Sequence, residues 1–191
     1  MIKALIFDFA GVITVRDAYW EWIKEKDLEG KRAIFQRLSE DVDRAYITHE
    51  QFVADFAKEM NVPPESVWAG IQARFAVNEE LVLLIGQLKK KYKIGLLSNF
   101  TYPWISELLK EYDLYECFDE MLISSREKMI KPDPQFFQRM LDALGVEADE
   151  AAFFDDKQAN VDAAEKMGIH AFLFTTNDQF RSDLRDFETI E

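Results

Sequence analysis

The sequence is poor in the residues that would define several other classes of protein. It has one cysteine, Cys117, which excludes an internal disulfide, and two histidines, so no Cys/His cluster is available to bind zinc. Aromatic residues flank Cys117, and no cationic side chain lies beside it, so we interpret it as a half-buried thiol in a reducing compartment. No apolar run approaches the roughly 20 residues of a membrane span. We expect a cytoplasmic protein that does not bind membranes.

Positive charge is also scarce. Lys and Arg number 23 against 36 Asp and Glu, which gives a formal net charge of −13. This charge repels the phosphate backbone of nucleic acids, so we expect no nucleic-acid partner. The sequence has no internal repeat and no Gly/Ser-rich or Pro-rich linker. With 48% hydrophobic and 31% charged residues, the chain is typical of one or two compact domains.

Short apolar runs predict the strands of a sheet. They are continuous rather than alternating, as is typical of strands covered on both faces in a parallel sheet. Helical patterns separate them: Asn78, Pro103 and Pro134 mark expected helix starts, and Gly145 marks an expected helix end. The pattern predicts an α/β fold with a doubly wound, Rossmann-like parallel sheet. The five predicted strands are Ala4–Phe7, Ile94–Leu97, Met121–Ile123, Ala151–Phe154 and Ala171–Phe174.

The connection between the first two predicted strands is about 80 residues long, far more than a crossover needs. It shows helical patterns and no strand pattern, with Asp17, Thr48 and Pro64 as expected helix starts. We predict that residues 14–77 form an inserted helical domain, and that residues 1–13 and 78–191 form the α/β core. The aromatic residues of the inserted domain are expected to form the core of a helical bundle. Trp20 or Trp22 would instead line a pocket if either faced the sheet.

Polar residues follow four of the five apolar runs. In an open parallel sheet these strand ends border one crevice, where such folds bind their ligands. Asp, Asn and Ser are also common in turns and helix caps, so any one position has a simpler explanation. Taken together, they favour a functional site. The residues are Asp8, Ser98, Asn99, Ser124, Ser125, Asp155 and Asp156.

Four ordered segments resemble the motifs of the haloacid dehalogenase (HAD) superfamily. They are FDFAGVIT at residues 7–14, LLSN at 96–99, KPDP at 131–134 and FFDDKQANVDAAEKMG at 153–168. Their order, spacing and placement after strands fit, and together they span nearly the whole chain. The helical insertion resembles the type 1 cap of that superfamily, in its subfamily I. The resemblance implies a phosphatase-like hydrolase.

The resemblance also implies roles for individual residues. Asp8 matches the nucleophile that forms an aspartyl-phosphate. Ser98 matches the hydroxyl that hydrogen-bonds a phosphoryl oxygen, with the backbone or amide of Asn99 beside it. Lys131 matches the lysine that holds the nucleophile and the phosphoryl oxygens by charge.

A magnesium site is implied in the same way. The ligands of Mg²⁺ are matched by Asp8, Asp156 and the backbone carbonyl of Ala10. Asp155 is either a further ligand or a residue that supports the ligands without binding the metal. Asn160 lies where many relatives carry another acid. The residue types support this assignment independently. Carboxylates at positions 8, 155 and 156 would repel one another without a cation, and hard oxygen donors suit Mg²⁺ better than zinc.

Ala10 departs from the pattern. Most phosphatases of the superfamily carry an aspartate at this position, which protonates the leaving group and then activates water. Such help is typically worth about 10²- to 10⁴-fold in rate. The sequence alone does not identify another residue that could act as the acid and base.

We therefore expect a Mg²⁺-dependent hydrolase that acts on a small phosphorylated metabolite through an aspartyl-phosphate, with turnover impaired by Ala10. One alternative is a non-catalytic phosphoryl-binding or regulatory protein. Another is an enzyme similar to phosphonoacetaldehyde hydrolases, which share the D-x-A-G start and use a cap lysine; Lys24, Lys26 and Lys31 are the candidates. The metal-free dehalogenases of the superfamily fit less well, because Asp156 predicts a metal.

Overall fold

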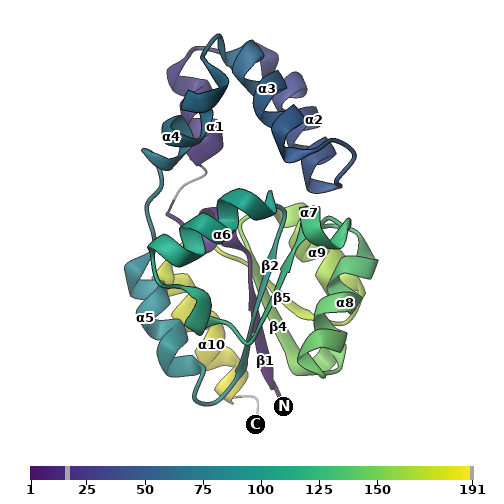
Figure 1. Ribbon diagram of the computed structural model, residues 1–191. Helices are drawn as coiled ribbons and strands as arrows, with labels where there is room; N and C mark the ends of the chain where they lie inside the picture. The colour runs from purple at the N-terminus through teal and green to yellow at the C-terminus, as the bar shows by residue number, and fades with distance from the viewer. Residues whose placement is uncertain (16–17, 190–191) are drawn as a thin grey trace.

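The computed structural model describes residues 1–15 and 18–189, with side chains up to residue 185. Five parallel strands form one sheet in the order β3-β2-β1-β4-β5, with β1 at its centre (Figure 1). This arrangement confirms the predicted doubly wound α/β fold. The five predicted runs coincide with the five strands, and no strand end is displaced by more than one residue. The strands are β1 (Ala4–Phe7), β2 (Lys93–Ser98), β3 (Glu120–Ile123), β4 (Ala151–Asp155) and β5 (His170–Leu173).

Helices follow the strands and also fill the long insertion. The α-helices are α1 (Ala18–Glu25), α2 (Arg32–Asp43), α3 (His49–Met60), α4 (Val67–Gln72), α5 (Glu79–Leu88), α6 (Tyr102–Glu111), α7 (Ser124–Glu127), α8 (Pro134–Leu144), α9 (Gln158–Lys166) and α10 (Asn177–Thr189). Shorter helical turns are Phe9–Ile13, Glu29–Lys31, Pro64–Ser66, Tyr115–Cys117 and Ala148–Glu150. Within the described residues, every helix is too short or too polar to span a lipid bilayer.

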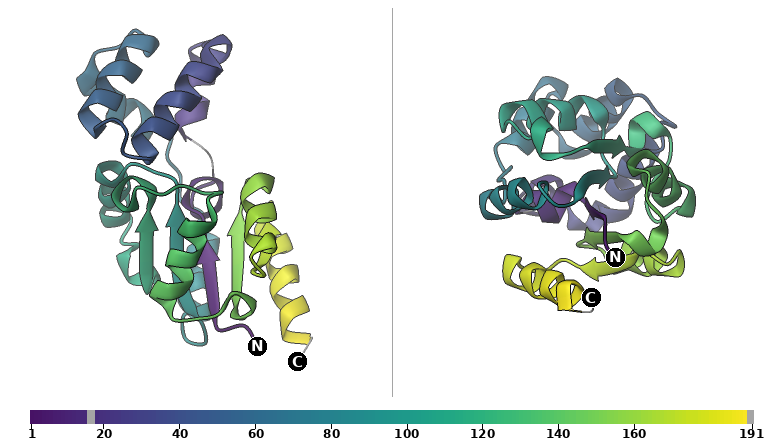
Figure 2. Two further views of the ribbon diagram at one scale, coloured as in Figure 1. Left: turned by 90° about the vertical axis from the view of Figure 1, so that its right-hand side faces the viewer. Right: turned by 90° about the horizontal axis from the view of Figure 1, so that it is seen from below.

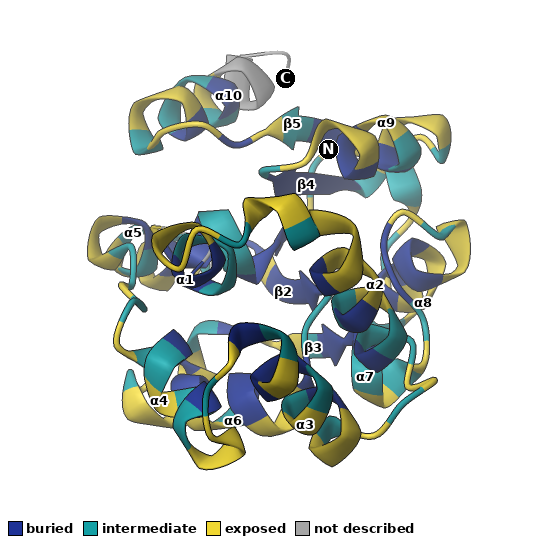
Figure 3. Ribbon diagram, turned by 90° about the horizontal axis from the view of Figure 1, so that it is seen from above, coloured by how far each residue is buried: buried dark blue, intermediate teal, exposed yellow. Residues whose placement is uncertain are grey.

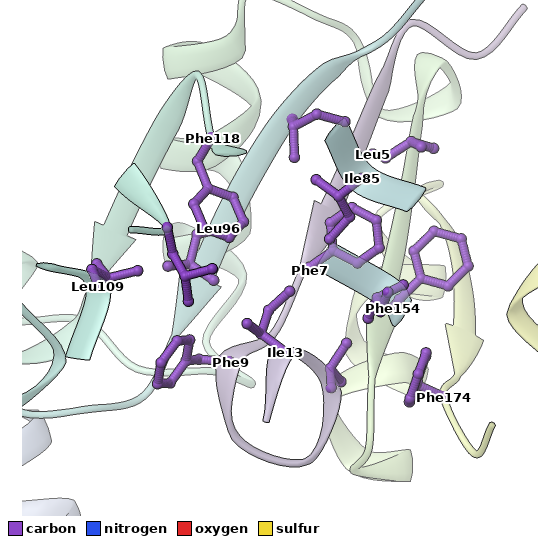
Figure 4. Packing of buried hydrophobic residues seen from close by; sticks show 14 of the residues in the cluster. Leu5, Phe7, Phe9, Ile13, Ile85, Leu96, Leu109, Phe118, Phe154 and Phe174 are labelled. Atoms are coloured by element: carbon purple, nitrogen blue, oxygen red, sulfur yellow. The ribbon is translucent and has the colours of Figure 1, made fainter. Parts of the chain in front are cut away.

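Alternate residues of each strand face opposite sides of the sheet and build two cores. Leu5 and Phe7 of β1 pack with Ile85 of α5 on one face (Figure 4). Phe180 of α10 belongs to the same cluster, with its ring against Phe7. Ala4 and Ile6 belong to a second cluster on the other face, which includes buried residues of α8 and α9. Because both faces are covered, the strands are continuously apolar, which is the pattern in the sequence. Cys117 packs at the edge of the first cluster and is half-buried.

Most expected helix boundaries are confirmed. The side chain of Asn78 accepts a hydrogen bond from Leu81 N, and Thr48 accepts one from Gln51 N, as helix N-caps do. Pro103 and Pro134 lie in the first turns of α6 and α8, and Gly145 ends α8 with a positive φ of 61°. Pro64 begins the short helical turn before α4. Asp17 lies outside the described residues.

Helices α1 to α4 form a unit with its own buried cluster, centred on Phe35 and Phe56. This unit stands above the carboxyl ends of the strands, whereas the N-terminus lies at the opposite end (Figure 2). Gly70 of α4 allows a close contact with α1, because a Cβ atom there would collide with the Trp22 ring. Trp104 of α6 joins the same cluster and stacks on Trp68 with ring centroids 5.0 Å apart. The helical unit is thus packed onto a helix of the sheet layer.

Two chain segments join the helical unit to the sheet, and they run side by side. Thr14 and Val77 form an isolated antiparallel bridge. Val15 N donates to Ala76 O, and Asn78 N donates to Ile13 O, both at 2.8 Å. The chain therefore leaves the sheet layer and returns to it at nearly the same place.

Candidate active site

The carboxyl ends of three adjacent strands bring together the polar residues that the sequence places there. Asp8 follows β1, Ser98 ends β2 and Asp155 ends β4. Asp8 and Asp155 flank the point where the chain order of the strands reverses, the usual ligand position in such sheets. Figure 3 looks down on this edge, with the helical unit nearest the viewer.

Ser124 and Ser125 have a different position. The hydroxyl of Ser124 accepts a hydrogen bond from Phe100 N at 3.0 Å, and that of Ser125 accepts one from Tyr102 N at 2.8 Å. Both hydroxyls thus support the loop that precedes α6. For these two residues the structure favours the simpler role in loop geometry.

Lys131 lies at the centre of the site, although its charge is almost fully buried. Its Nζ is 2.8 Å from Asp8 Oδ1 and 2.6 Å from Asp155 Oδ2. The Lys131 side chain is 1% exposed, and those of Asp8 and Asp155 are 6% and 0% exposed. An isolated buried ammonium group would lose its proton, but the two carboxylates raise the pKa of Lys131 above its ordinary value against the effect of burial. The lysine therefore carries a fixed positive charge beside Asp8.

Asp155 is fully engaged in hydrogen bonds. Besides Lys131, its carboxylate accepts hydrogen bonds from Lys157 N at 2.8 Å and from Asn160 Nδ2 at 2.9 and 3.0 Å. The amide of Asn160, itself buried, thus spans both carboxylate oxygens. These contacts orient the carboxylate toward Lys131. Two roles were open for Asp155, and the geometry favours that of a residue that supports the ligands without binding the metal.

Asn99 holds the loop that carries Lys131. Its Oδ1 accepts a hydrogen bond from Lys131 N, and its Nδ2 donates to Lys131 O, each at 2.8 Å. This arrangement leaves the backbone of Asn99, rather than its amide, to meet a ligand. The hydroxyl of Ser98 is buried, and among the described residues it has no hydrogen-bond partner. A buried hydroxyl without a partner is costly unless a ligand or water satisfies it.

A tight turn follows Asp8. Ala10 has φ −75° and ψ 123°, and Gly11 has φ 82° and ψ −2°, which are the angles of a type II turn. Only glycine fits at position 11 without strain, because of the positive φ and because a Cβ atom there would lie 2.6 Å from Asp156 Oδ2. The turn thus brings the backbone beside Asp156. It also places the small side chain of Ala10 at the wall of a cavity.

Asp8, Asp155 and Asp156 form a cluster that can hold a metal ion. Each offers a carboxylate oxygen within 4.8 Å of the others. The pKa of Asp8 is raised from 3.8 to about 7, chiefly by burial; Asp155 and Asp156 add to the rise, while Lys131 and Lys157 oppose it. Three carboxylates lie here against the two lysines, so the formal charge of the site is negative. Hard oxygen donors with an excess of negative charge fit a divalent cation such as Mg²⁺.

A cavity of about 570 Å³ lies between this edge of the sheet and the helical unit. Ala10, Lys131 and Asn160 line it from below. Its aromatic wall includes Tyr19, Trp20 and Phe52, so a few of the aromatic residues expected in the bundle core also face this cavity. Trp22, Phe35 and Phe56 are buried in the bundle, as predicted.

The three candidate lysines of the insertion do not line this cavity. Lys24 and Lys26 are exposed, and Lys31 pairs with Glu59 at 2.9 Å. Their positions give no support to a mechanism that uses a lysine of the insertion.

Asp43, the last residue of α2, is a site residue that the sequence analysis missed. It lines the cavity, and its pKa is raised from 3.8 to about 7, chiefly by burial. The charges of Asp8 and Glu40 raise the pKa further, and those of Lys157 and Lys131 lower it. Asp43 is thus within electrostatic range of Asp8. The only signal in the sequence is an acidic residue at a helix end, which many surface helices share.

The fold is an open parallel α/β sheet, and its buried lysine–carboxylate centre lies at the carboxyl edge, where proteins of this class bind their ligands. The model of the haloacid dehalogenase-like hydrolases matches residues 2–168, and the chain belongs to this family. This match confirms the hydrolase that the four motifs predict.

Individual relatives agree with the family assignment. The D-ribitol-5-phosphate phosphatase of Bacteroides thetaiotaomicron is 27% identical, with 96% of this chain and 97% of that protein covered. The sesquiterpene phosphatase astK of Aspergillus oryzae is 25% identical, with 87% of each covered. A HAD family enzyme of B. thetaiotaomicron, solved with magnesium and inorganic phosphate, has the same fold at a TM-score of 0.77 and 22% identity, covering 93% of this chain and 96% of that one.

Proposed function

We propose that this chain is a Mg²⁺-dependent phosphatase that hydrolyses a small phosphorylated metabolite through an aspartyl-phosphate on Asp8. The observation that carries the proposal is the buried ammonium group of Lys131, 2.8 Å from Asp8 Oδ1 and beside two further aspartates. Such a centre binds a dianion and a divalent cation together. The names of the phosphatase relatives support the reaction class.

Asp8 acts as the nucleophile in this proposal. Its Oδ1 accepts hydrogen bonds from Phe9 N at 2.7 Å and from Lys131 Nζ, so we assign the attack on phosphorus to Oδ2. Lys131 stabilises the charge that develops on the phosphoryl oxygens. The Ser98 hydroxyl and the Asn99 backbone N–H would donate to the same oxygens, because the sheet edge presents both beside Lys131.

Mg²⁺ would be held by Asp8, Asp156 and the carbonyl of Ala10. Asp155 would keep the ammonium group of Lys131 in place through their ion pair. The ion, when bound, supplies positive charge that offsets repulsion between the phosphoryl group and the carboxylates. Because Gly11 has no side chain, the turn lies close to Asp156. The carbonyl of Ala10 and the Asp156 carboxylate can then bind the same ion.

The helical unit acts as a cap over the site, with residues 14–77 as the inserted domain and residues 1–13 and 78–191 as the core. The cavity between the two parts supports this role, because a ligand at Lys131 would contact both. The cap excludes water from the phosphoryl group and selects the organic part of the substrate.

A phosphate-release assay tests the proposal. Purified protein is assayed with p-nitrophenyl phosphate and with a panel of phosphorylated sugars and alcohols, with Mg²⁺ or with EDTA. We expect Mg²⁺-dependent release that Asp8→Asn abolishes and that Asp162→Asn, an exposed position on α9, leaves unchanged. If the Asp8→Asn variant and the unmodified protein release phosphate equally, the proposed function is wrong. Phosphate binding without turnover would instead indicate a phosphoryl-binding protein.

A further inference from the structure

Hydrolysis of an alkyl phosphate needs a proton at the leaving oxygen, because an alkoxide is a poor leaving group. The residues that follow the nucleophile cannot supply it. Phe9 is buried and apolar, Ala10 carries a methyl group, and Gly11 has no side chain. The donor must therefore come from another part of the cavity wall.

Few groups on the described cavity wall can donate a proton and then accept one. The pKa of Lys131 is raised, and its ammonium group is bound to two carboxylates, so it stays charged. Tyr19 donates its hydroxyl proton to Phe35 O at 2.8 Å, within the helical unit. Guanidinium groups on the wall do not release protons in proteins. Lys157 also lines the wall and acts there as a cation that lowers the pKa of both Asp8 and Asp43. The acidic residues of the wall are Glu40 and Asp43, both on α2.

These two acids differ in their surroundings. Glu40 is exposed, whereas Asp43 is partly buried at the end of α2, where the charges of Lys157, Asp8 and Lys131 act on it. Helix α2 contacts α7, the short helix after β3, which brings the end of α2 down to the edge of the sheet (Figure 1). Lys131 and Lys157 face Asp43 from the sheet side, together with Asp8.

We propose that Asp43 is the acid and base of this active site, supplied by the helical unit across the cavity from Ala10. This inference rests on the proposed phosphatase function. The raised pKa of Asp43, about 7, supports it, because a carboxyl group of that pKa holds its proton in part of the protein near neutral pH.

The proposed reaction has two steps. An Asp8 oxygen bonds to phosphorus while the bond from phosphorus to the leaving oxygen breaks; the electron pair goes to that oxygen, which takes the proton of Asp43 and leaves as an alcohol. The Asp43 carboxylate then takes a proton from water as the water oxygen bonds to phosphorus. The bond between phosphorus and Asp8 breaks, its electron pair returns to the Asp8 carboxylate, and phosphate leaves. The net change is phosphate ester plus water to alcohol plus phosphate.

Leaving-group dependence tests this assignment. Asp43→Asn is compared with the unmodified protein on an alkyl substrate, β-glycerophosphate, and on p-nitrophenyl phosphate, whose leaving group needs no proton. We expect kcat to fall by about 10²- to 10⁴-fold on the alkyl ester and by less than about 10-fold on the aryl ester. The control is Asp41→Asn, on the same helix but outside the cavity wall, which should change neither rate. Thermal melting confirms that both variants are folded.

A second variant strengthens the test. Adding Ala10→Asp to Asp43→Asn places a carboxyl group on the opposite wall of the same cavity, and recovery of the alkyl reaction by the double variant supports the assignment. Equal losses on both esters in Asp43→Asn would make Asp43 a binding residue and overturn it, as would no loss on either. Those outcomes leave the phosphatase function intact, whereas an unmodified protein with no Mg²⁺-dependent turnover of the aryl ester overturns both proposals.

Discussion

Asn99 and Lys131 are joined by two hydrogen bonds of 2.8 Å between the amide of Asn99 and the backbone of Lys131. The loop after β2 thus fixes the backbone of the residue whose ammonium group reaches Asp8. The position of the charge depends on this pairing as well as on the ion pairs of Lys131.

Asn99→Ala should therefore reduce kcat more than it affects folding. It leaves one backbone donor and one acceptor of Lys131 unsatisfied, which costs about 1–3 kcal/mol in the free energy of unfolding. We expect kcat to fall at least 10-fold, because a displaced Lys131 no longer meets the phosphoryl group. Urea unfolding and steady-state kinetics measure the two effects. An unchanged kcat would show that Lys131 is held by its ion pairs alone.

Lys131→Met removes the buried cation and leaves Asp8 and Asp155 without it. Breaking a buried ion pair in this way typically costs about 3–5 kcal/mol. The loss should be largest at pH 8 and smaller at pH 5, since removal of Lys131 takes away the charge that lowers the pKa of Asp8, and protonation of that carboxyl then relieves its repulsion with Asp155. Urea unfolding at both pH values measures this difference. A loss that does not depend on pH would contradict the electrostatic explanation.

Gly11 and Gly86 provide a matched pair for the turn after Asp8. Gly11→Ala forces an L-residue into a positive φ and a Cβ atom against Asp156, so we expect destabilisation by about 1–3 kcal/mol and a weaker response of the melting temperature to Mg²⁺. Gly86→Ala, in α5 with no atom near the added Cβ, should raise stability by about 0.5–1 kcal/mol. Melting curves of both variants with Mg²⁺ and with EDTA make the comparison.

The assignment of Asp156 as a metal ligand predicts how Mg²⁺ stabilises the fold. A cation that binds only the folded state raises the melting temperature with concentration. Asp156→Asn should remove most of this rise, whereas Asp162→Asn should keep it. A full rise in the Asp156→Asn variant would refute the ligand assignment.

The raised pKa of Asp43 predicts a dependence of stability on pH in EDTA. The ordinary pKa of this carboxyl group is 3.8, and in the folded protein it is about 7. Between about pH 4 and 7 the folded protein therefore holds a proton that the unfolded chain has lost, so this group lowers the free energy of unfolding as pH rises, by at most about 1.4 kcal/mol per pH unit. Asp43→Asn should become increasingly stable relative to the unmodified protein from pH 5 to pH 8. A constant difference in urea unfolding would show an ordinary pKa.

The strands and the core of the site could be predicted because their signals are local. A fully buried parallel strand is a continuous apolar run, and the residue that ends it lies at the edge of the sheet whatever the helices do. Asp8, Asp155 and the expected α/β fold follow from that rule. Lys131 lies outside a strand, and its place beside Asp8 was implied by the resemblance of its motif to a known family.

Asp43 could not be predicted in the same way, because its position depends on how the helical unit packs on the sheet layer. That packing is set by contacts such as Trp104 against Trp68, which join distant parts of the chain. Ser124 and Ser125 show the converse difficulty. They follow β3 as expected, but nearby backbone N–H groups donate hydrogen bonds to both hydroxyls, a local competition that composition does not reveal.

The bridge between Thr14 and Val77 brings the two ends of the helical unit together at the sheet layer. Because the two segments are already paired as antiparallel neighbours, a short hairpin turn can join them, and the sheet layer would keep its own connectivity. In the same way, the helices of another protein could be grafted between these two residues if they also covered Trp104 of α6. Under the proposals above, such a graft would change the substrate preference and the group that transfers the proton. Asp8 and Lys131 would be kept, because they belong to the sheet layer.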